Sequence, residues 1–322
     1  MVKFERSFNI FVVLVFTLGL LEEVPAEETT KVPGDKAREM CKQYSQYAYE
    51  PLGSTKLKCL IKPESYITNK TVASEGEFPH TIQLGYINND KTTWICGGIL
   101  LSPTFIATTG HCIPTGSRIG YGTLKFARGG LTDIDETKHE QIRNITRTFL
   151  HPSINKKYND IALVEVDRPF DLNPYLRPAC LYTQHNIPEK TTLSTSWGRK
   201  WLGLDDGFDD KKLLKVTLDI FSNAECNKVY QPLVKHSDLD KGIDEASMIC
   251  AGTRTDRNSC IGISGYPLML VHPDTESVKC MYDVIGITSF GIPCTSNDTN
   301  KPSVYMRISN YIGWIEKLVW SN

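Results

Sequence analysis

Short runs of apolar residues, separated by Gly, Pro, Asn and Asp, make up most of the chain from Ile67 onward. Typical runs are HTIQLGYI, GGILLSPTFIATT, DIALVEV, KLLKVTLDIF and YDVIGITSF. Many short strands with turn residues between them are typical of a β sandwich or β barrel. The pattern therefore predicts one all-β unit of two subdomains, from Ile67 to the end of the chain.

Two stretches have the spacing of helices instead. Near the C-terminus, SNYIGWIEKLVW places Ile312, Ile315, Leu318 and Val319 on one stripe after a Ser309 or Asn310 cap, which predicts a helix docked on the barrel. The charged stretch 27–66 contains a helical segment over 35–49. It predicts an N-terminal segment distinct from the unit that follows.

The first 26 residues have the features of a secretory signal peptide. Lys3 and Arg6 precede an apolar stretch, residues 10–21, and Val24-Pro25-Ala26 offers a small-residue cleavage site. The alternative is a short buried helix, which would not need these three features together. We therefore expect a mature chain that begins near Glu27 and is secreted. The sequence contains no apolar run of about 18 residues or more, so no membrane-spanning helix is expected.

Composition narrows the function classes. A net charge of −1 argues against a nucleic-acid binder, which needs a basic face for phosphate. The even number of cysteines, 10, favours disulfides in an oxidising compartment. No C-x2-C pair is present, so a zinc site is disfavoured and no metal or cofactor is expected. Three sequons, at Asn69, Asn144 and Asn297, are compatible with secretion.

Three short motifs could carry chemistry. TTGHC contains His111, NDIAL contains Asp160, and GISG contains Ser264 in a glycine-flanked turn. Each alone is weak, since a lone His or Asp is usually structural. Together, in the order His, Asp, Ser, they match one known order of a catalytic triad. A serine hydroxyl becomes a nucleophile only when a base takes its proton and a buried carboxylate orients that base.

From Ile67 to the end, the chain resembles the chymotrypsin-like serine peptidases of family S1, and within them the secreted insect snake-like branch. The resemblance is carried by ordered motifs: WICGGILLSPTFIATTGHC, YNDIALVEV, RPACL, SWGR, MICAGT, SCIGISGYPL, GITSFG and PSVYMRI. It implies two six-stranded antiparallel β-barrels with a C-terminal helix, and no cofactor. It also implies a His111/Asp160/Ser264 triad, an oxyanion hole from the backbone of Gly262 and Ser264, and activation by cleavage between Tyr66 and Ile67.

The same resemblance implies a disulfide pattern. Cys96 would pair with Cys112, Cys226 with Cys250, and Cys260 with Cys294. Cys59, just before the cleavage region, would pair with Cys180, which leaves Cys41 with Cys280; the exchange of these last two partners stays open. Only two cysteines, Cys41 and Cys59, precede Ile67, so no six-cysteine clip domain is expected.

The chain departs from the family at its activation residue. In an active member, the new N-terminal ammonium pairs with an aspartate directly before the nucleophilic serine, and here that place holds Ile263. A buried charge without a partner costs about 3–5 kcal/mol. Without that ion pair, the loop with Gly262 loses the contact that organises it. Loss of one oxyanion donor costs roughly 100- to 1000-fold in kcat.

The cleavage region departs as well. Tyr66 stands where the family has Arg or Lys, and the nearest basic residue, Lys62, precedes a proline. A trypsin-like activator is therefore not expected to cut, although a chymotrypsin-like one could cut after Tyr66. The glycines that normally follow the new N-terminus are replaced, and a glycan on Asn69 would obstruct insertion of Ile67.

The residues around the serine and the primary pocket also differ. Tyr266 replaces a glycine behind the serine, where a ring needs space. Asn258 occupies the pocket base, Gly291 keeps one wall open, and Ser303 replaces a glycine on the other wall. Without a buried acid, the pocket is expected to favour neutral or small side chains.

Two hypotheses follow from the sequence. The first, which these departures favour, is a catalytically impaired S1 homologue that binds proteases or their substrates in an extracellular cascade. The second is an active secreted endopeptidase that uses the triad after cleavage at Tyr66–Ile67. Both predict secreted protein partners, with no nucleic acid and no membrane.

Overall fold

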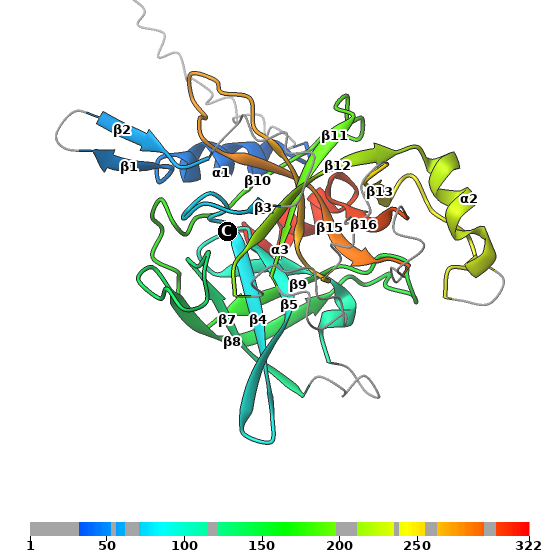
Figure 1. The fold of residues 1–322 in the computed structure, drawn as a ribbon, viewed down its shortest axis with the longest axis horizontal. Helices are drawn as coiled ribbons and strands as arrows, with labels where there is room; N and C mark the ends of the chain where they lie inside the picture. The colour runs from blue at the N-terminus through cyan, green and yellow to red at the C-terminus, as the bar shows by residue number, and fades with distance from the viewer. Residues whose placement is uncertain are drawn as a thin grey trace, which may run out of the picture. The chain divides into compact units, whose positions relative to one another are not determined.

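The computed structural model describes residues 32–52, 56–61, 71–114, 122–197, 211–234, 238–254, 263–292 and 301–321. Six strands in the first half of the chain close into a barrel (Figure 1). Along the barrel their order is β4 (Thr81–Asn88), β5 (Lys91–Leu100), β6 (Phe105–Thr108), β9 (Ala162–Val166), β8 (Gln141–Leu150) and β7 (Thr123–Gly129). The barrel closes because β4 pairs with both β5 and β7.

Six later strands close a second barrel. Their order is β11 (Thr191–Ser196), β12 (Leu214–Phe221), β13 (Met248–Gly252), β16 (Ser303–Arg307), β15 (Tyr282–Phe290) and β14 (Pro267–Val271). The pairing of β14 with β11 completes the ring. Two short strands extend this sheet: β3 (Thr71–Val72) on β12, and β10 (Cys180–Leu181) parallel to β15. The prediction of two six-stranded antiparallel barrels is confirmed.

Strand β9 shows why the apolar runs are nearly continuous. Successive side chains of a strand point to opposite faces. In β9, Ala162, Val164 and Val166 fill the interior of the first barrel, whereas Leu163 joins a second cluster with residues of β13, β15 and β16. Both faces are therefore buried, and no polar alternation is seen in the sequence.

The C-terminal helix is α3 (Ile312–Val319). Ile312 and Ile315 are buried, and Leu318 and Val319 pack against the same cluster, as the predicted stripe requires. The expected Ser309 or Asn310 cap is wrong. A 3-10 turn over Ile308–Tyr311 leads into the helix, so Tyr311 occupies the N-cap and makes no side-chain capping bond.

The described part of the N-terminal segment packs against the second barrel and helix α3. Helix α1 (Asp35–Ser45) ends earlier than the predicted 35–49, because β1 (Tyr49–Leu52) begins there and pairs with β2 (Lys56–Cys59). The α1 residues Ala37, Cys41 and Tyr44 are buried. Its first turn is held by Glu316 of α3, whose Oε1 accepts from the backbone N–H of Gly34 at 3.0 Å and of Ala37 at 2.8 Å.

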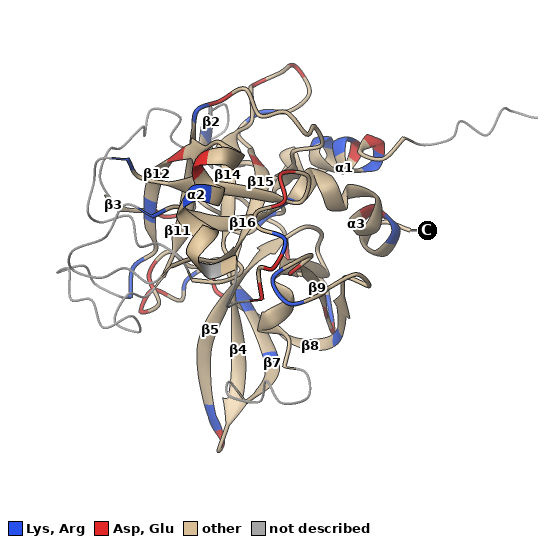
Figure 2. Ribbon diagram, turned by 90° about the vertical axis from the view of Figure 1, so that its right-hand side faces the viewer, with Lys and Arg blue, Asp and Glu red and all other residues tan. Residues whose placement is uncertain are grey.

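Basic and acidic residues are interspersed along α1 (Figure 2). The remaining α-helix among the described residues is α2 (Asn223–Val234). No helix in the described ranges is long and apolar enough to cross a membrane.

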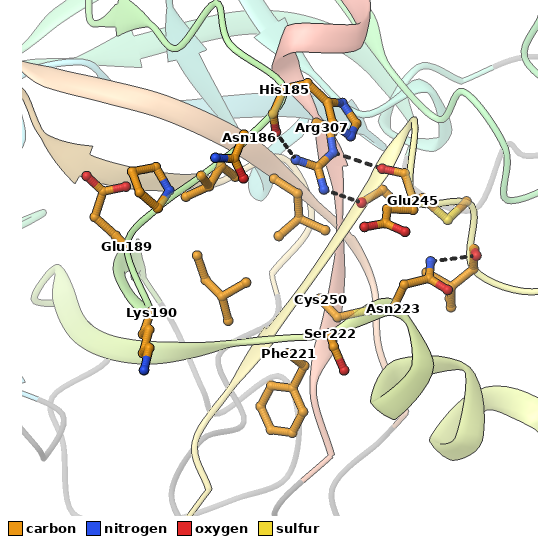
Figure 3. Close-up of a pocket in the computed structure, with 16 residues that line it drawn as sticks. His185, Asn186, Glu189, Lys190, Phe221, Ser222, Asn223, Glu245, Cys250 and Arg307 are labelled. Atoms are coloured by element: carbon orange, nitrogen blue, oxygen red, sulfur yellow. Dashed lines mark hydrogen bonds between the residues drawn. The ribbon is translucent and has the colours of Figure 1, made fainter.

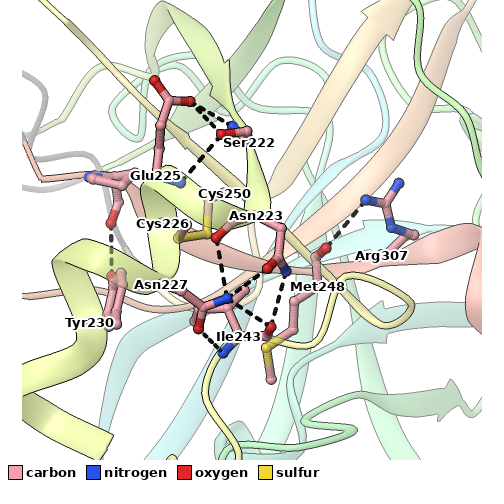
Figure 4. Close-up of a disulfide and its surroundings, with 11 residues drawn as sticks. Ser222, Asn223, Glu225, Cys226, Asn227, Tyr230, Ile243, Met248, Cys250 and Arg307 are labelled. Atoms are coloured by element: carbon pink, nitrogen blue, oxygen red, sulfur yellow. Dashed lines mark hydrogen bonds between the residues drawn. A yellow bond between two sulfur atoms is a disulfide. The ribbon is translucent and has the colours of Figure 1, made fainter.

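Four disulfides are seen among the described residues. Cys96–Cys112 and Cys226–Cys250 confirm the expected pairs, and the second of them fastens α2 to β13 (Figure 4). Cys260 and Cys294 lie outside the described residues.

The other two expected pairs are wrong, because their partners are exchanged. Cys41 pairs with Cys180, with Cα atoms 4.8 Å apart, and Cys59 pairs with Cys280, at 5.8 Å. Cys41 lies on the buried face of α1, which packs against β10, where Cys180 is the first residue. The β1–β2 hairpin then returns the chain and places Cys59 opposite Tyr49, next to Ala48, whose carbonyl lies 3.7 Å from Cys280 Sγ. Distance along the sequence could not show this change of direction.

The observed pairing predicts the fragments of a non-reduced digest. We expect mass spectrometry to find Cys41 linked to Cys180 and Cys59 linked to Cys280. Replacing both Cys59 and Cys280 by serine should lower the free energy of unfolding by about 2–5 kcal/mol, because the closed loop is long. A Cys41–Cys280 fragment from the native protein would contradict the pairing.

Candidate active site

His111 and Asp160 come together because they lie at neighbouring strand ends. Strands β6 and β9 pair with Thr108 opposite Ala162, so the 3-10 turn after β6 (Gly110–Cys112) meets Asp160, two residues before the start of β9. The Asp160 Oδ2 atom lies 2.7 Å from His111 Nδ1, and its Oδ1 accepts from the His111 backbone N–H at 2.8 Å. These two contacts fix the imidazole relative to the carboxylate.

Asp160 is only 2% exposed. Burial by itself raises the pKa of a carboxyl, but the hydrogen bonds and charge of His111 and the hydroxyl of Ser289 outweigh it, so the pKa of Asp160 lies below its ordinary value. The carboxylate is therefore ionised at neutral pH. It can hold the proton of His111 on Nδ1 and leave Nε2 free to act as a base.

Ser264 lies in a tight turn where the two barrels meet. Its carbonyl accepts from the N–H of Gly97 in β5 at 2.8 Å, and Gly265 N–H donates to Thr288 O in β15 at 2.8 Å. Gly265 has φ +89°, and a Cβ there would lie 2.2 Å from Gly97 O. Only glycine fits this position.

The structure brings the three predicted triad residues to one junction. Thr288 bonds the turn of Ser264, and the next residue, Ser289, donates its hydroxyl to Asp160 Oδ2. Among the bonds between described residues, none joins Ser264 Oγ to His111 Nε2. Catalytic hydrogen bonds are often long in unliganded enzymes, so this arrangement is compatible with either hypothesis.

Ser289 is a site residue that the sequence analysis missed. It is buried and is the second side chain that bonds the Asp160 carboxylate. The signal for Ser289 in the sequence is the GITSFG motif, which carries the family resemblance but does not by itself indicate a contact with Asp160.

Ile263, at the place where the family has its activation aspartate, is half-buried in apolar surroundings. It packs against a cluster that includes Trp197, Leu213, Tyr266 and Met269. A charged amino group at this cluster would meet hydrocarbon and ring edges in place of a carboxylate.

Gly291 and Ser303, the expected pocket walls, face each other. A Cβ on Gly291 would lie 3.0 Å from Ser303 Oγ, so the hydroxyl occupies part of the space between the strands. Several expected site residues lie outside the described residues: Asn258 and Gly262, the cleavage pair Tyr66 and Ile67, and the sequons at Asn69 and Asn297.

Asn144, the third sequon, lies in β8. Its side-chain amide donates to Asp167 Oδ2 at 2.8 Å, and Asp167 Oδ1 accepts from its backbone N–H. A glycan on this amide would have to form beside that carboxylate.

A cavity of about 290 Å³ lies elsewhere, between the His185–Lys190 connection, the ends of β12 and β13, and Arg307 (Figure 3). None of the triad residues lines it. The Arg307 guanidinium donates to the carbonyls of His185, Glu245 and Met248, and burial lowers its pKa. Arg307 thus joins the His185 connection to the segment from Glu245 to the start of β13.

Potential metal ligands gather at one point among the described residues: Cys41, Cys180 and His272. The two sulfurs form a disulfide, so they cannot supply thiolate ligands. His272 in turn bonds the carboxylate of Asp283 at 2.8 and 2.9 Å.

Two closed six-stranded barrels with a His–Asp pair and a serine turn at their junction define a chymotrypsin-like serine peptidase fold. Residues 67–315 match the sequence model of the Trypsin family, and the chain belongs to that family. It is similar to the proteins named serine protease snk, from Drosophila melanogaster, and phenoloxidase-activating enzyme, from Bombyx mori. The identities are 31% and 30%, over 79% and 77% of this chain.

These relatives are longer than the region that matches. The alignments cover 57% of snk and 59% of the phenoloxidase-activating enzyme. Among solved structures, mouse neuropsin, described as a serine protease, superposes with a TM-score of 0.58 at 23% identity. That match covers 78% of this chain and 99% of neuropsin, and it supports the fold alone.

Proposed function

We propose that this chain is a secreted serine protease homologue with impaired peptidase activity, which acts as a binding or regulatory component of an extracellular proteolytic cascade. The observation that carries the proposal is Ile263 in its apolar cluster, next to Ser264. The amino group released by cleavage before Ile67 has no carboxylate to pair with at that position.

The new amino terminus can be inserted beside Ile263 or remain in water, and the two states differ in free energy. Inserting an unpaired ammonium into buried apolar surroundings costs about 3–5 kcal/mol, whereas leaving it in water costs nothing. The inserted state is therefore populated at most at about 1%, since 1.4 kcal/mol is a factor of ten. The oxyanion donor expected at Gly262 then lacks the interaction that would organise it.

The rest of the fold supports a binding role. The barrels, the His111–Asp160 pair and the serine turn are those of a peptidase, whose active site binds protein chains. The Ser303 hydroxyl narrows the substrate pocket beside Gly291. One of the relatives described above is named for the activation of phenoloxidase. Partners that are themselves proteases, or substrates of proteases, are the corresponding proposal for this chain. The disulfides and the signal sequence expected over residues 1–26 favour an extracellular location.

The second candidate is an endopeptidase activated by cleavage after Tyr66. The observation that favours it is the intact orientation of His111 by the ionised Asp160. In that reaction Ser264 Oγ attacks the peptide carbonyl, His111 takes its proton and returns it to the leaving amine, and Asp160 orients His111. The N–H groups of Gly262 and Ser264 would stabilise the oxyanion. Asn258, Gly291 and Ser303 would line the substrate pocket.

A fluorophosphonate probe distinguishes the two candidates. We expect Ser264 in the cut protein to be labelled at least about 100-fold more slowly than trypsin under the same conditions, because the oxyanion site is not organised. Cutting before Ile67 is made controllable by placing the recognition sequence of a specific endopeptidase up to residue 66. Labelling of the cut protein at the rate of trypsin, lost in Ser264→Ala, would overturn the proposed function in favour of the endopeptidase.

A further inference from the structure

The Tyr266 ring lies flat against the first barrel, behind the serine turn. The side chain is 2% exposed, and a Cβ on Gly97 would lie 2.5 Å from its ring carbons. The missing side chain of Gly97 therefore leaves the space that the Tyr266 ring fills. Any larger residue at position 97 would displace the ring. The ring of Trp197, from the second barrel, is 6.1 Å away between centroids.

The Tyr266 hydroxyl reaches a polar network in the first barrel. Burial raises the pKa of this phenol, while contacts with the Gln83 side chain, the Arg128 charge and the Trp197 backbone act in the opposite direction. Gln83 Oε1 accepts from Arg128 Nε at 2.7 Å. Arg128 in turn lies 3.2 Å from Glu140 Oε1 and 4.1 Å from the ring centroid of Trp94. The hydroxyl thus contacts Gln83 of β4 in the first barrel and the backbone of Trp197, which follows β11 of the second barrel.

The backbone around the same residue is tied to both barrels. Tyr266 O accepts from the N–H and from the hydroxyl of Thr288, each at 2.9 Å. Gly97, beneath the ring, donates its N–H to Ser264 O, and its own carbonyl accepts from the Thr108 hydroxyl at 2.8 Å. None of these contacts involves a charged amino terminus.

We propose that Tyr266 is a positioning residue that anchors the Ser264 turn between the barrels, so that the turn keeps its geometry whether or not the chain is cut before Ile67. The proposal rests on the proposed function in one respect: with Ile263 in place of a carboxylate, the new terminus has no partner through which to reorganise the turn. The anchor fixes Ser264 and the residues after it.

Hydrogen–deuterium exchange of the segment 263–271 tests the anchor. We expect the wild-type segment to exchange at the same rate, within about twofold, before and after cutting. In Tyr266→Gly we expect exchange in this segment to rise at least about tenfold, while β8 peptides, as an internal reference, stay unchanged. Tyr266→Phe keeps the ring and loses the hydroxyl contact, so its rise should be smaller. Tyr44→Phe, which removes a buried hydroxyl from α1, is the matched control and should leave 263–271 unchanged.

A rescue experiment separates positioning from general packing. In the double variant Ile263→Asp/Tyr266→Gly, cutting should restore protection of 263–271, because the ammonium–aspartate pair can then organise the turn. A structural defect from the missing ring would not be repaired by cutting. If Tyr266→Gly does not fold, Gln83→Met removes the amide that contacts the hydroxyl, and the same segment should exchange faster.

Two results would overturn the anchor: a wild-type segment that becomes protected only after cutting, or a segment unaffected by Tyr266→Gly and by Gln83→Met. These outcomes are independent of the labelling of Ser264. Rapid fluorophosphonate labelling with cut-independent exchange would end the proposed function and leave the anchor standing.

Discussion

Replacing Ile263 by aspartate is expected to raise hydrolysis of a chromogenic peptide ester at least about 100-fold, and only in protein cut before Ile67. The variant supplies the carboxylate that the buried ammonium lacks. Once the pair forms, the segment before Ser264 is held in place and its backbone N–H groups can face the oxyanion. His111 and Asp160 already have the orientation that the reaction needs. Steady-state hydrolysis and fluorophosphonate labelling of cut and uncut protein measure the effect.

Ile263→Asn is the matched control, because it has the shape of aspartate without the charge. It should leave the activity at the wild-type level in both forms, and Ser264→Ala in the aspartate background should abolish the gain. Equal gains from asparagine and aspartate would show that removal of the isoleucine, and not the ion pair, changes the site. Absence of any gain in the cut aspartate variant would mean that other departures, such as those after Ile67, block insertion.

The parts of the site that sequence could predict are those fixed by local motifs. His111 and Asp160 each stand at a strand end, and the two strands pair, so motif order alone brought them together correctly. The two-barrel fold was predicted from many motifs in a known order. The buried stripe of α3 was predicted from the spacing of its apolar residues.

The rest depends on contacts between distant segments. The predicted disulfide partners of Cys41 and Cys59 were wrong, because the packing of α1 against β10 has no sequence signature near either cysteine. Tyr266 was interpreted from sequence only as a ring that needs space. That Gly97, 169 positions earlier, provides this space could be seen only in three dimensions. The role of Ser289 likewise follows from a bond across 129 positions.

Removing one member of a buried ion pair is expected to have the largest effect on stability. Glu77 is 1% exposed, and its Oε1 lies 2.5 Å from Nζ of Lys215, whose side chain is 6% exposed. Glu77 Oε2 also accepts from the Ser74 N–H at 2.8 Å. Glu77 follows β3, which pairs with β12, and Lys215 is part of β12. The pair therefore fastens the segment between β3 and β4 to the second barrel.

Lys215→Met should lower the free energy of unfolding by about 3–5 kcal/mol, because it leaves the Glu77 carboxylate buried without its cation. Urea unfolding followed by tryptophan fluorescence measures the loss. The double variant Glu77→Gln/Lys215→Met is the control: the amide oxygen can still accept from Ser74, and no charge remains, so its stability should return to within about 1 kcal/mol of wild type. If the double variant were as unstable as Lys215→Met, the loss would come from the packing of the lysine stem. The carboxylate would then have enough solvent or other donors to remain charged without Lys215.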